Sequence, residues 1–392
     1  MTELHDIYIR KGKEGGLSRM HPWIFSGALF SGHKELQNGD WVTVRSHDDR
    51  ILGTGYYSQG SIAVRILAFG ESIAPEEVLP KRIKEAWRAR EIAGIMDLPG
   101  TDSFRLVFAE GDALPGLIID WYAGNAVVQC HHEGMDRMIP IIQNTLKELN
   151  GWKATYLRNK DLIKDPIHKD GLLDGDPAEH ILAMEYGHRF LIDVEGGQKT
   201  GFFLDQRENR RIIGQLSEGK TVLNAFGYTG GFSVYALAGG ARHVTTVDIS
   251  ERAMQITDRN IEWNDPSFLK KHTSLTANVF DFLKEDALDH DIIILDPPAF
   301  AKRRSSSHNA VVGYKRLNAM AMEKMKSGSI LMTFSCSQNV PFQLFYDTIR
   351  AAGIESRREI RVLQRLVQPM DHPVRLSHPE GEYLKGLLLE IV

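Results

Sequence analysis

Cysteine is scarce in this sequence, and its scarcity excludes two classes of protein. Only Cys130 and Cys336 occur. Two cysteines cannot form the disulfide framework of a small secreted domain, and they lack the paired spacing of a zinc site. Two histidines follow Cys130, but no further ligands stand nearby at a useful spacing, so we expect no metal.

Long apolar runs are absent as well. No segment approaches the length of a transmembrane helix. The first residues, MTELHDIYIRKGKEGG, contain no apolar core of a secretory signal peptide. Together with the few cysteines, these absences lead us to expect a cytoplasmic protein without a membrane partner.

A surplus of positive charge is also missing. The chain has 47 Lys and Arg against 51 Asp and Glu, a net charge of −4. Proteins that bind nucleic acid without sequence preference are usually basic, so the composition argues weakly against that class. An enzyme that concentrates positive charge at an RNA site remains compatible with it.

At 392 residues the chain is too long for one core, and composition shifts along it predict three parts. Residues 1–72 alternate in short strands with glycine turns, which predicts a small β-barrel. Its aromatic segment, residues 20–27, is expected to plug the barrel rather than to stack bases. Residues 73–190 predict an α+β domain, with a helix at 134–149 and a loop at 159–179. Residues 191–392 predict a doubly wound α/β domain.

The segment from Thr221 to Ser250 organises the third part. It reads as strand, glycine turn, helix, strand and a final acid, Asp248, which is the first half of a nucleotide-binding α/β sheet. The motif G-x-G-x-x-G is absent, and Phe226 and Tyr228 make the turn too bulky for a pyrophosphate, which disfavours a dehydrogenase. We therefore expect a nucleoside without phosphate, S-adenosylmethionine, with its ribose at Asp248. An α/β unit without a ligand is the alternative.

Polar residues end five predicted strands of this part. Ligands of open α/β sheets bind beyond the carboxyl ends of the strands, so these residues should converge on one edge. The third strand is expected to end within residues 278–281. A preceding segment, residues 196–207, carries aromatic, Gln, Lys and Arg side chains suited to the amino-acid tail of the cofactor. The strand-end residues are Asn224, Asp248, Asn278, Asp296 and Cys336.

Cys336 and Asp296 suggest a covalent reaction. If their strands are neighbours, the two tips lie about 5 Å apart, so that a thiolate and a carboxylate stand side by side. A thiolate that adds to carbon 6 of a pyrimidine turns carbon 5 into a nucleophile toward a methyl sulfonium. A lone cysteine is more often an inert core residue, and a lone Asp-Pro-Pro carboxylate equally often caps its turn. The juxtaposition favours chemistry.

These motifs resemble the RlmI-type large-subunit ribosomal RNA cytosine-5 methyltransferases. The resemblance covers essentially the whole chain. It rests on HPWIFSGAL, RLVFAEGDALPGLIID, QKTGFFLDQRENR, NAFGYTGGFSVYA, LDPPAFAK, TFSCS and HPEGEYLKG. It implies an N-terminal PUA domain, a central α+β domain and a Rossmann-like methyltransferase domain. A related group that methylates guanine N7 lacks the cysteine of TFSCS, so Cys336 favours cytosine.

The resemblance also implies roles for single residues. Cys336 would be the nucleophile and Asp296 would contact the cytosine ring and the cofactor. Asn278 and Asn224 stand where acids are more usual. The following residues are expected around S-adenosylmethionine: Gln206, Asn224, Phe226, Gly227, Tyr228, Thr229, Asp248, Asn278 and Val279.

Ribosomal RNA is the expected partner, and a homodimer is an open expectation. Lys302, Arg303 and Arg304 follow the Asp-Pro-Pro segment and should contact RNA phosphates, although a solvated loop has the same composition. Two other functions stay open. The chain could methylate another RNA base position without covalent catalysis, or it could be an RNA-binding assembly factor whose cofactor site has decayed.

Overall fold

The computed structural model describes residues 2–160, 162–285, 288–300 and 307–392. The RNA contacts expected at Lys302, Arg303 and Arg304 lie outside the described residues. The chain forms two compact units. The first comprises Met1–Tyr186, Ile192–Leu204 and Met370–Gly381, and the second comprises Gly187–Leu191, Asp205–Pro369 and Glu382–Val392.

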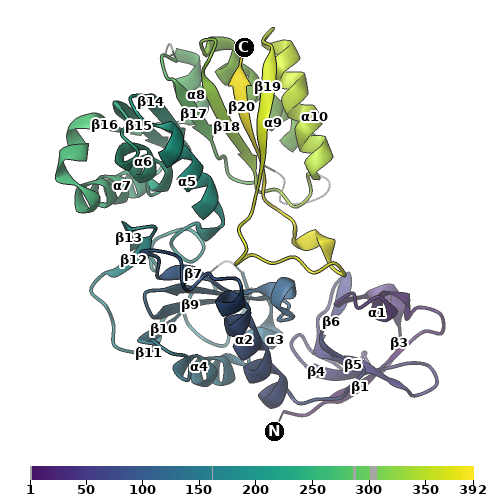
Figure 1. Ribbon diagram of the computed structural model, residues 1–392. Helices are drawn as coiled ribbons and strands as arrows, with labels where there is room; N and C mark the ends of the chain where they lie inside the picture. Colours follow the sequence, from purple (N-terminus) through teal and green to yellow (C-terminus); the bar gives the residue numbers. More distant parts are fainter. Residues whose placement is uncertain (1, 161, 286–287, 301–306) are drawn as a thin grey trace. The chain divides into compact units, whose positions relative to one another are not determined.

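The first unit begins with a six-stranded sheet, drawn in purple in Figure 1. The strand order is β2-β6-β5-β4-β1-β3, and β1 runs parallel to β4. Ile7, Val44 and Ile66 are among the residues that form its core. Its elements are β1 (His5–Ile9), α1 (Gly15–Ser18), β2 (Trp23–Phe25), β3 (Leu29–Ser31), β4 (Trp41–Arg45), β5 (Ile51–Tyr57) and β6 (Ile62–Phe69).

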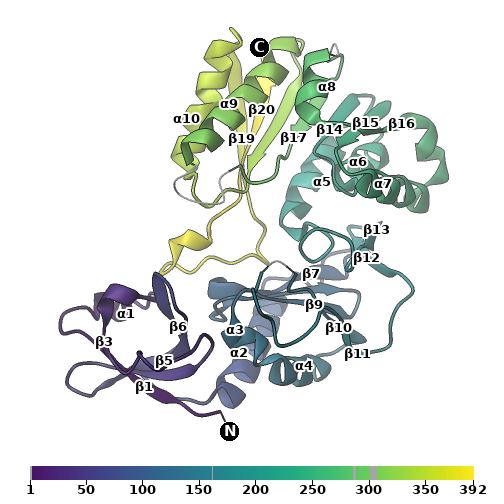
Figure 2. The same ribbon diagram turned by 180° about the vertical axis from the view of Figure 1, so that it is seen from behind.

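A five-stranded sheet of order β11-β10-β9-β8-β7 completes most of the first unit, as Figure 2 shows from behind. The chain then forms β12 (Ile181–Glu185), in the first unit, and β13 (His188–Ile192), whose residues 188–191 belong to the second unit. The other elements are α2 (Pro75–Ile92), β7 (Ser103–Phe108), β8 (Leu117–Tyr122), β9 (Asn125–Cys130), α3 (Glu133–Asp136), α4 (Ile139–Lys147), β10 (Ala154–Leu157) and β11 (Gly171–Gly175).

Two sequence expectations for this unit are wrong in detail. The helix expected at residues 134–149 is two helices, α3 and α4, because Pro140 sits in the first turn of α4 and begins a new helix there. The loop expected at 159–179 contains β11, which pairs antiparallel with β10 at the edge of the sheet. Its sequence, GLLDG, has too short an apolar pattern to indicate a strand.

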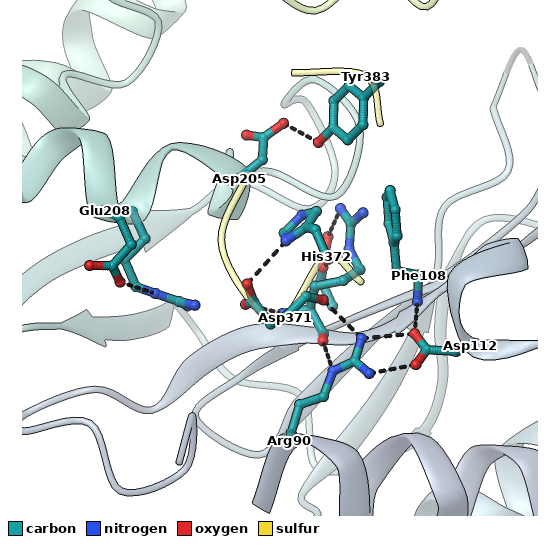
Figure 3. Close-up of polar contacts among 11 residues, drawn as sticks. Arg90, Phe108, Asp112, Asp205, Glu208, Asp371, His372 and Tyr383 are labelled. Carbon is teal, nitrogen blue, oxygen red and sulfur yellow. Dashed lines mark hydrogen bonds and ion pairs between the residues drawn. The ribbon is translucent and has the colours of Figure 1, made fainter. Parts of the chain in front are cut away.

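The segment Met370–Gly381 lies between two strands of the second unit in sequence but belongs to the first unit. Figure 3 shows how it is held. The Arg90 side chain donates to the Asp371 carbonyl oxygen at 2.8 Å, and the Arg105 amide donates to the Asp371 carboxylate at 3.0 Å. Arg90 also pairs with Asp112, at 2.8 Å for its Nη2. A buried ion pair thus anchors the segment.

The second unit is built on a seven-stranded sheet of order β16-β15-β14-β17-β18-β20-β19. The first five strands are parallel and the last two are antiparallel to their neighbours. Its strands are β14 (Thr221–Ala225), β15 (His243–Asp248), β16 (His272–Thr276), β17 (Ile292–Leu295), β18 (Ile330–Ser335), β19 (Ile360–Val367) and β20 (Lys385–Ile391).

Helices cover both faces of this sheet. Leu223 and Ala225 of β14 belong to a core shared with α8, α9 and α10, whereas Asn224 points to the opposite face and binds Ser233 of α6. None of the described helices is long and apolar enough to cross a membrane. The helices are α5 (Arg207–Leu216), α6 (Gly231–Ala238), α7 (Glu251–Asn264), α8 (Val279–Glu285), α9 (Ser307–Lys324) and α10 (Phe342–Glu355).

The α/β architecture expected from the sequence is confirmed, with one correction. Residues 279–281 do not end the third strand, because β16 stops at Thr276 and α8 begins at Val279. The Asn278 side-chain oxygen accepts from the Phe280 amide at 2.9 Å, which satisfies one free donor of the first helical turn. The division at residues 72 and 190 stays a prediction.

Candidate functional site

The carboxyl ends of the parallel strands gather the residues expected at the site. Asp248 ends β15, Asp296 follows β17 and Cys336 follows β18. The condition that the fourth and fifth strands are neighbours is met, because Leu295 of β17 pairs with Thr333 of β18. Asn224 lies one residue inside the end of β14, and Asn278 comes two residues after β16.

The turn after β14 has an unusual backbone. Phe226 and Tyr228 have φ angles of 61° and 46°, and Gly230 has a φ of 77°. The left-handed region is costly for residues with a Cβ atom, by roughly 1 to 2 kcal/mol each. Such outliers persist only where the surroundings impose them, and they cluster at binding sites. The strained turn therefore marks this end of β14 as a candidate ligand site.

Side chains of helix α7 hydrogen-bond to the backbone of the turn after β14. The Thr257 hydroxyl donates to the Tyr228 carbonyl oxygen at 2.9 Å, and the Asn260 amide donates to the Thr229 carbonyl oxygen at 2.8 Å. From the next strand, Asp248 accepts from the Tyr228 amide at 3.0 Å and from the Ser250 amide at 2.9 Å. These bonds fix the Asp248 carboxylate at the turn, and its remaining lone pairs can accept from ribose hydroxyls.

A buried polar chain lies under the turn. The Asn224 amide donates to Ser233 at 2.9 Å, Ser233 contacts Thr246 at 2.6 Å, and the Thr246 hydroxyl contacts the His272 ring at 2.7 Å. Burial lowers the pKa of His272 to about 4, so this imidazole is neutral at neutral pH. The chain fixes the orientation of Asn224.

Two buried polar atoms at the turn have no hydrogen-bond partner among the residues that the structure describes. They are the Asn224 side-chain oxygen and the Thr229 hydroxyl, and both residues are about 1% exposed. Buried polar atoms are usually satisfied in native proteins, and a ligand bound at this turn would satisfy these two. Together with the strained turn and Asp248, they fit the adenosine part of S-adenosylmethionine.

Asn278 and Val279 lie farther along the same edge. Asn278 is exposed, and its side-chain oxygen already caps α8, with one lone pair left for a ligand. Val279 is buried at the first position of that helix. Their expected place beside the cofactor base stays a prediction.

Asp296 is oriented by the segment that precedes the turn. The Gln206 amide nitrogen donates to Asp296 at 3.0 Å, and its amide oxygen accepts from Asn209 at 2.6 Å. Beside it, the Tyr383 hydroxyl donates to Asp205, as Figure 3 shows. Gln206 is therefore placed to position Asp296, a role that its sequence context did not reveal.

Cys336 lies beside the Asp-Pro-Pro segment that follows the neighbouring strand. Its thiol lies 4.0 Å from the carbonyl oxygen of Pro297, the residue after Asp296. Cys336 as a residue is partly exposed, whereas the other cysteine, Cys130, is buried, and burial raises the pKa of Cys130 well above its ordinary value. A nucleophilic cysteine must be reachable and ionisable, and Cys336 meets the first condition.

One group of metal-type ligands occurs among the described residues. Ligand atoms of His21, His378 and Glu380 lie within 4.8 Å of one another, all in the first unit. The His21 Nδ1 atom accepts from the Trp23 amide at 3.2 Å, which leaves the proton on the Nε2 atom that faces Glu380 at 3.6 Å. A protonated nitrogen cannot ligate a metal, so His21 is not a metal ligand in this arrangement.

The fold and this edge define a methyltransferase of the α/β class. A model of the S-adenosylmethionine-dependent methyltransferase family matches residues 105–380, and a PUA-like domain model matches residues 7–69. The chain belongs to this S-adenosylmethionine-dependent methyltransferase family, and S-adenosylmethionine is its cofactor.

Relatives resemble the chain over its full length. It is 38% identical to Ribosomal RNA large subunit methyltransferase I of Pseudoalteromonas atlantica, over 98% of this chain and 99% of that protein. The enzyme of the same name from Shewanella amazonensis is 37% identical, with the same coverage. Among solved structures, a methyltransferase from Streptococcus mutans is 24% identical over 100% of both chains with a TM-score of 0.83, which shows the shared fold.

Proposed function

We propose that this protein methylates carbon 5 of a cytosine in large-subunit ribosomal RNA, with Cys336 as the covalent nucleophile. The observation that carries the proposal is the pairing of β17 with β18, together with the 4.0 Å distance between the Cys336 thiol and the carbonyl oxygen of Pro297, the residue after Asp296. The names of the full-length relatives support ribosomal RNA as the substrate.

The cofactor supplies an electrophilic methyl group when it is bound at Asn224, the turn and Asp248. The Cys336 thiolate adds to carbon 6 of the cytosine, and the displaced electron pair is taken up at the ring nitrogen N3, which gains a proton beside Asp296. Carbon 5 then bonds to the methyl carbon while the bond between that carbon and the cofactor sulfur breaks, so that S-adenosylhomocysteine is the leaving group. A base accepts the carbon 5 proton, the bond between carbon 6 and the Cys336 sulfur breaks, N3 gives back its proton beside Asp296, and the thiolate is regenerated with 5-methylcytosine.

The RNA has to offer the base outside its stack, because neither strand tip can reach carbon 6 within a helix. The PUA-like domain is the part that we assign to RNA binding, and Lys302, Arg303 and Arg304 are proposed phosphate contacts. A cytoplasmic location and a homodimer stay predictions.

Methyl transfer from labelled S-adenosylmethionine to large-subunit RNA from cells that lack this protein tests the proposal. Wild type, Cys336→Ala and the matched control Cys130→Ala are compared. We expect label in 5-methylcytosine with wild type and Cys130→Ala and no label with Cys336→Ala. Equal labelling by all three proteins would indicate methylation of a base without covalent catalysis. No labelling together with no cofactor binding would indicate an assembly factor.

A trapped adduct gives a second measurement. RNA that contains 5-fluorocytosine has no carbon 5 proton to lose, so the thiol cannot leave after methyl transfer. We expect a covalent complex with wild type that resists denaturation and that Cys336→Ala does not form. Its absence from an active wild type would overturn the covalent route.

A further inference from the structure

Lys385 is a buried cation at the end of the strand that borders Cys336. It is the first residue of β20 and is 2% exposed. Its amino group donates to the Ser337 carbonyl oxygen at 2.7 Å, and it forms no ion pair with any residue that the structure describes. A buried ammonium without a carboxylate partner is expensive to maintain, so its presence calls for an explanation.

The strand register places this amino group across the Cys336 segment. Lys385 pairs directly with Ser335, the last residue of β18, and binds Ser337 two residues further on. Cys336 lies between these two contacts. The charge of Lys385 and the ionised Cys336 thiol attract each other, which favours the charged form of both groups.

The other ionisable groups around this pair do not supply the positive charge. Glu382 also favours the protonated Lys385, whereas burial disfavours it and lowers the pKa of Lys385 to about 8. Tyr314, whose hydroxyl contacts Ser337 at 3.0 Å, has a pKa raised by burial and is neutral at pH 7. The Asp296 carboxylate at the neighbouring tip opposes a second negative charge.

We propose that Lys385 is a positioning residue that holds Cys336 as a thiolate and fixes the backbone of residues 335–337 around it. The proposal rests on the assignment of Cys336 as the nucleophile. Lys385 does not bond to the substrate in this scheme. Its charge offsets the carboxylate of Asp296, so that the nucleophile is ionised before the cytosine arrives.

The test measures the ionisation of Cys336 directly. In a Cys130→Ala background, the rate of alkylation by iodoacetamide is followed from pH 5 to pH 10 without RNA. Four proteins are compared: the background itself, Lys385→Gln, Lys385→Arg and the control Lys270→Met, which changes an exposed lysine in the same unit. Gln keeps a donor for the Ser337 carbonyl oxygen without the charge, and Arg keeps the charge. Thermal melting and cofactor binding verify folding.

We expect Lys385→Gln to raise the thiol pKa by at least one unit and so to slow alkylation about tenfold at pH values below both thiol pKa values, at the acid end of the range. Lys385→Arg and Lys270→Met should stay within twofold of the background. An unchanged thiol pKa in folded Lys385→Gln would overturn the proposal, because the hydrogen bond alone would then be sufficient. If Lys385→Gln does not fold, the thiol pKa of the background protein tests the proposal instead. A Cys336 thiol pKa at or above 8.5 would contradict a preformed thiolate.

The outcome is independent of the RNA reaction. A Lys385-dependent thiol pKa in a protein that makes no 5-methylcytosine would support the role of Lys385 and refute the proposed function. An ordinary thiol pKa in an enzyme that forms the covalent adduct would refute the role of Lys385 and support the proposed function. The two proposals can therefore fail separately.

Discussion

The Gln206 side chain bonds Asp296 at 3.0 Å and is itself fixed by Asn209 at 2.6 Å. Both ends of its amide are occupied, and it is 3% exposed. A carboxylate that must meet a flipped cytosine ring gains orientation from such a partner, because a free Asp side chain populates several rotamers.

Replacement of Gln206 by Leu should therefore impair turnover more than cofactor binding. Loss of one hydrogen bond to a charged group costs about 1.5 to 3 kcal/mol, which corresponds to a decrease in kcat of roughly 10- to 100-fold. The cofactor Kd, measured by calorimetry, should change less than threefold. A weaker cofactor Kd with an unchanged kcat would restore Gln206 to the cofactor-binding role that its sequence context suggested.

Glycine at position 228 should relieve the backbone strain of the turn after β14, whereas alanine at the same position should not. Tyr228 has a φ of 46°, a conformation that glycine adopts without strain. Tyr228→Gly and Tyr228→Ala remove the same ring, but only the first removes the Cβ atom. We expect the free energy of unfolding in urea to be about 1 kcal/mol higher for Tyr228→Gly than for Tyr228→Ala. Cofactor binding should be weakened in both variants. A more stable alanine variant would refute strain at this turn.

The sequence anticipated the strand-end residues because their signals are local. Asn224, Asp248, Asp296 and Cys336 each follow an apolar run, and parallel topology brings such ends to one edge. The roles of Gln206 and Lys385 could not be anticipated in this way. They depend on which segments meet in space, and the pairing of Ser335 with Lys385 joins positions far apart in the chain.

The two segments that the sequence analysis assigned wrongly, β11 and the residues after Asn278, gave misleading local patterns. None of the residues of β11 is buried, so neither of its faces requires apolar residues, and Asp174 and two glycines make its sequence resemble a loop. At Asn278, a capping signal was available, since Asn favours the position before a helix, but the apolar residues after it resembled a strand.

His272 should make the second unit sensitive to acid. Burial lowers its folded pKa to about 4, below the value of about 6.5 in an unfolded chain. The unfolded state therefore takes up the proton first as the pH falls. Its contribution to stability is complete above pH 6.5, declines between pH 6.5 and 4, and is constant below that.

Denaturant unfolding at pH 7.5 and 5.0 measures this effect. We expect a loss of about 2 kcal/mol from His272 at pH 5, from 1.4 kcal/mol per unit over 1.5 units. His272→Gln keeps a partner for Thr246 and should reduce the loss by that amount. An identical pH dependence in His272→Gln would show that the ring does not stay neutral.

Loss of the Arg90–Asp112 pair should strongly destabilise the first unit. Both side chains are nearly inaccessible, and Arg90 additionally holds the Asp371 carbonyl oxygen, as Figure 3 shows. Arg90→Met leaves the Asp112 carboxylate buried without its cation, and breaking a buried pair in this way costs about 3 to 5 kcal/mol. The control Arg88→Met removes an exposed arginine from the same helix and should cost less than about 0.5 kcal/mol.

Unfolding monitored by circular dichroism compares the stability of the two variants. Protease cleavage within residues 370–381 should accelerate only in Arg90→Met. Equal stability of the two variants would mean that Asp112 is neutralised by protonation and that the segment is held by its other contacts.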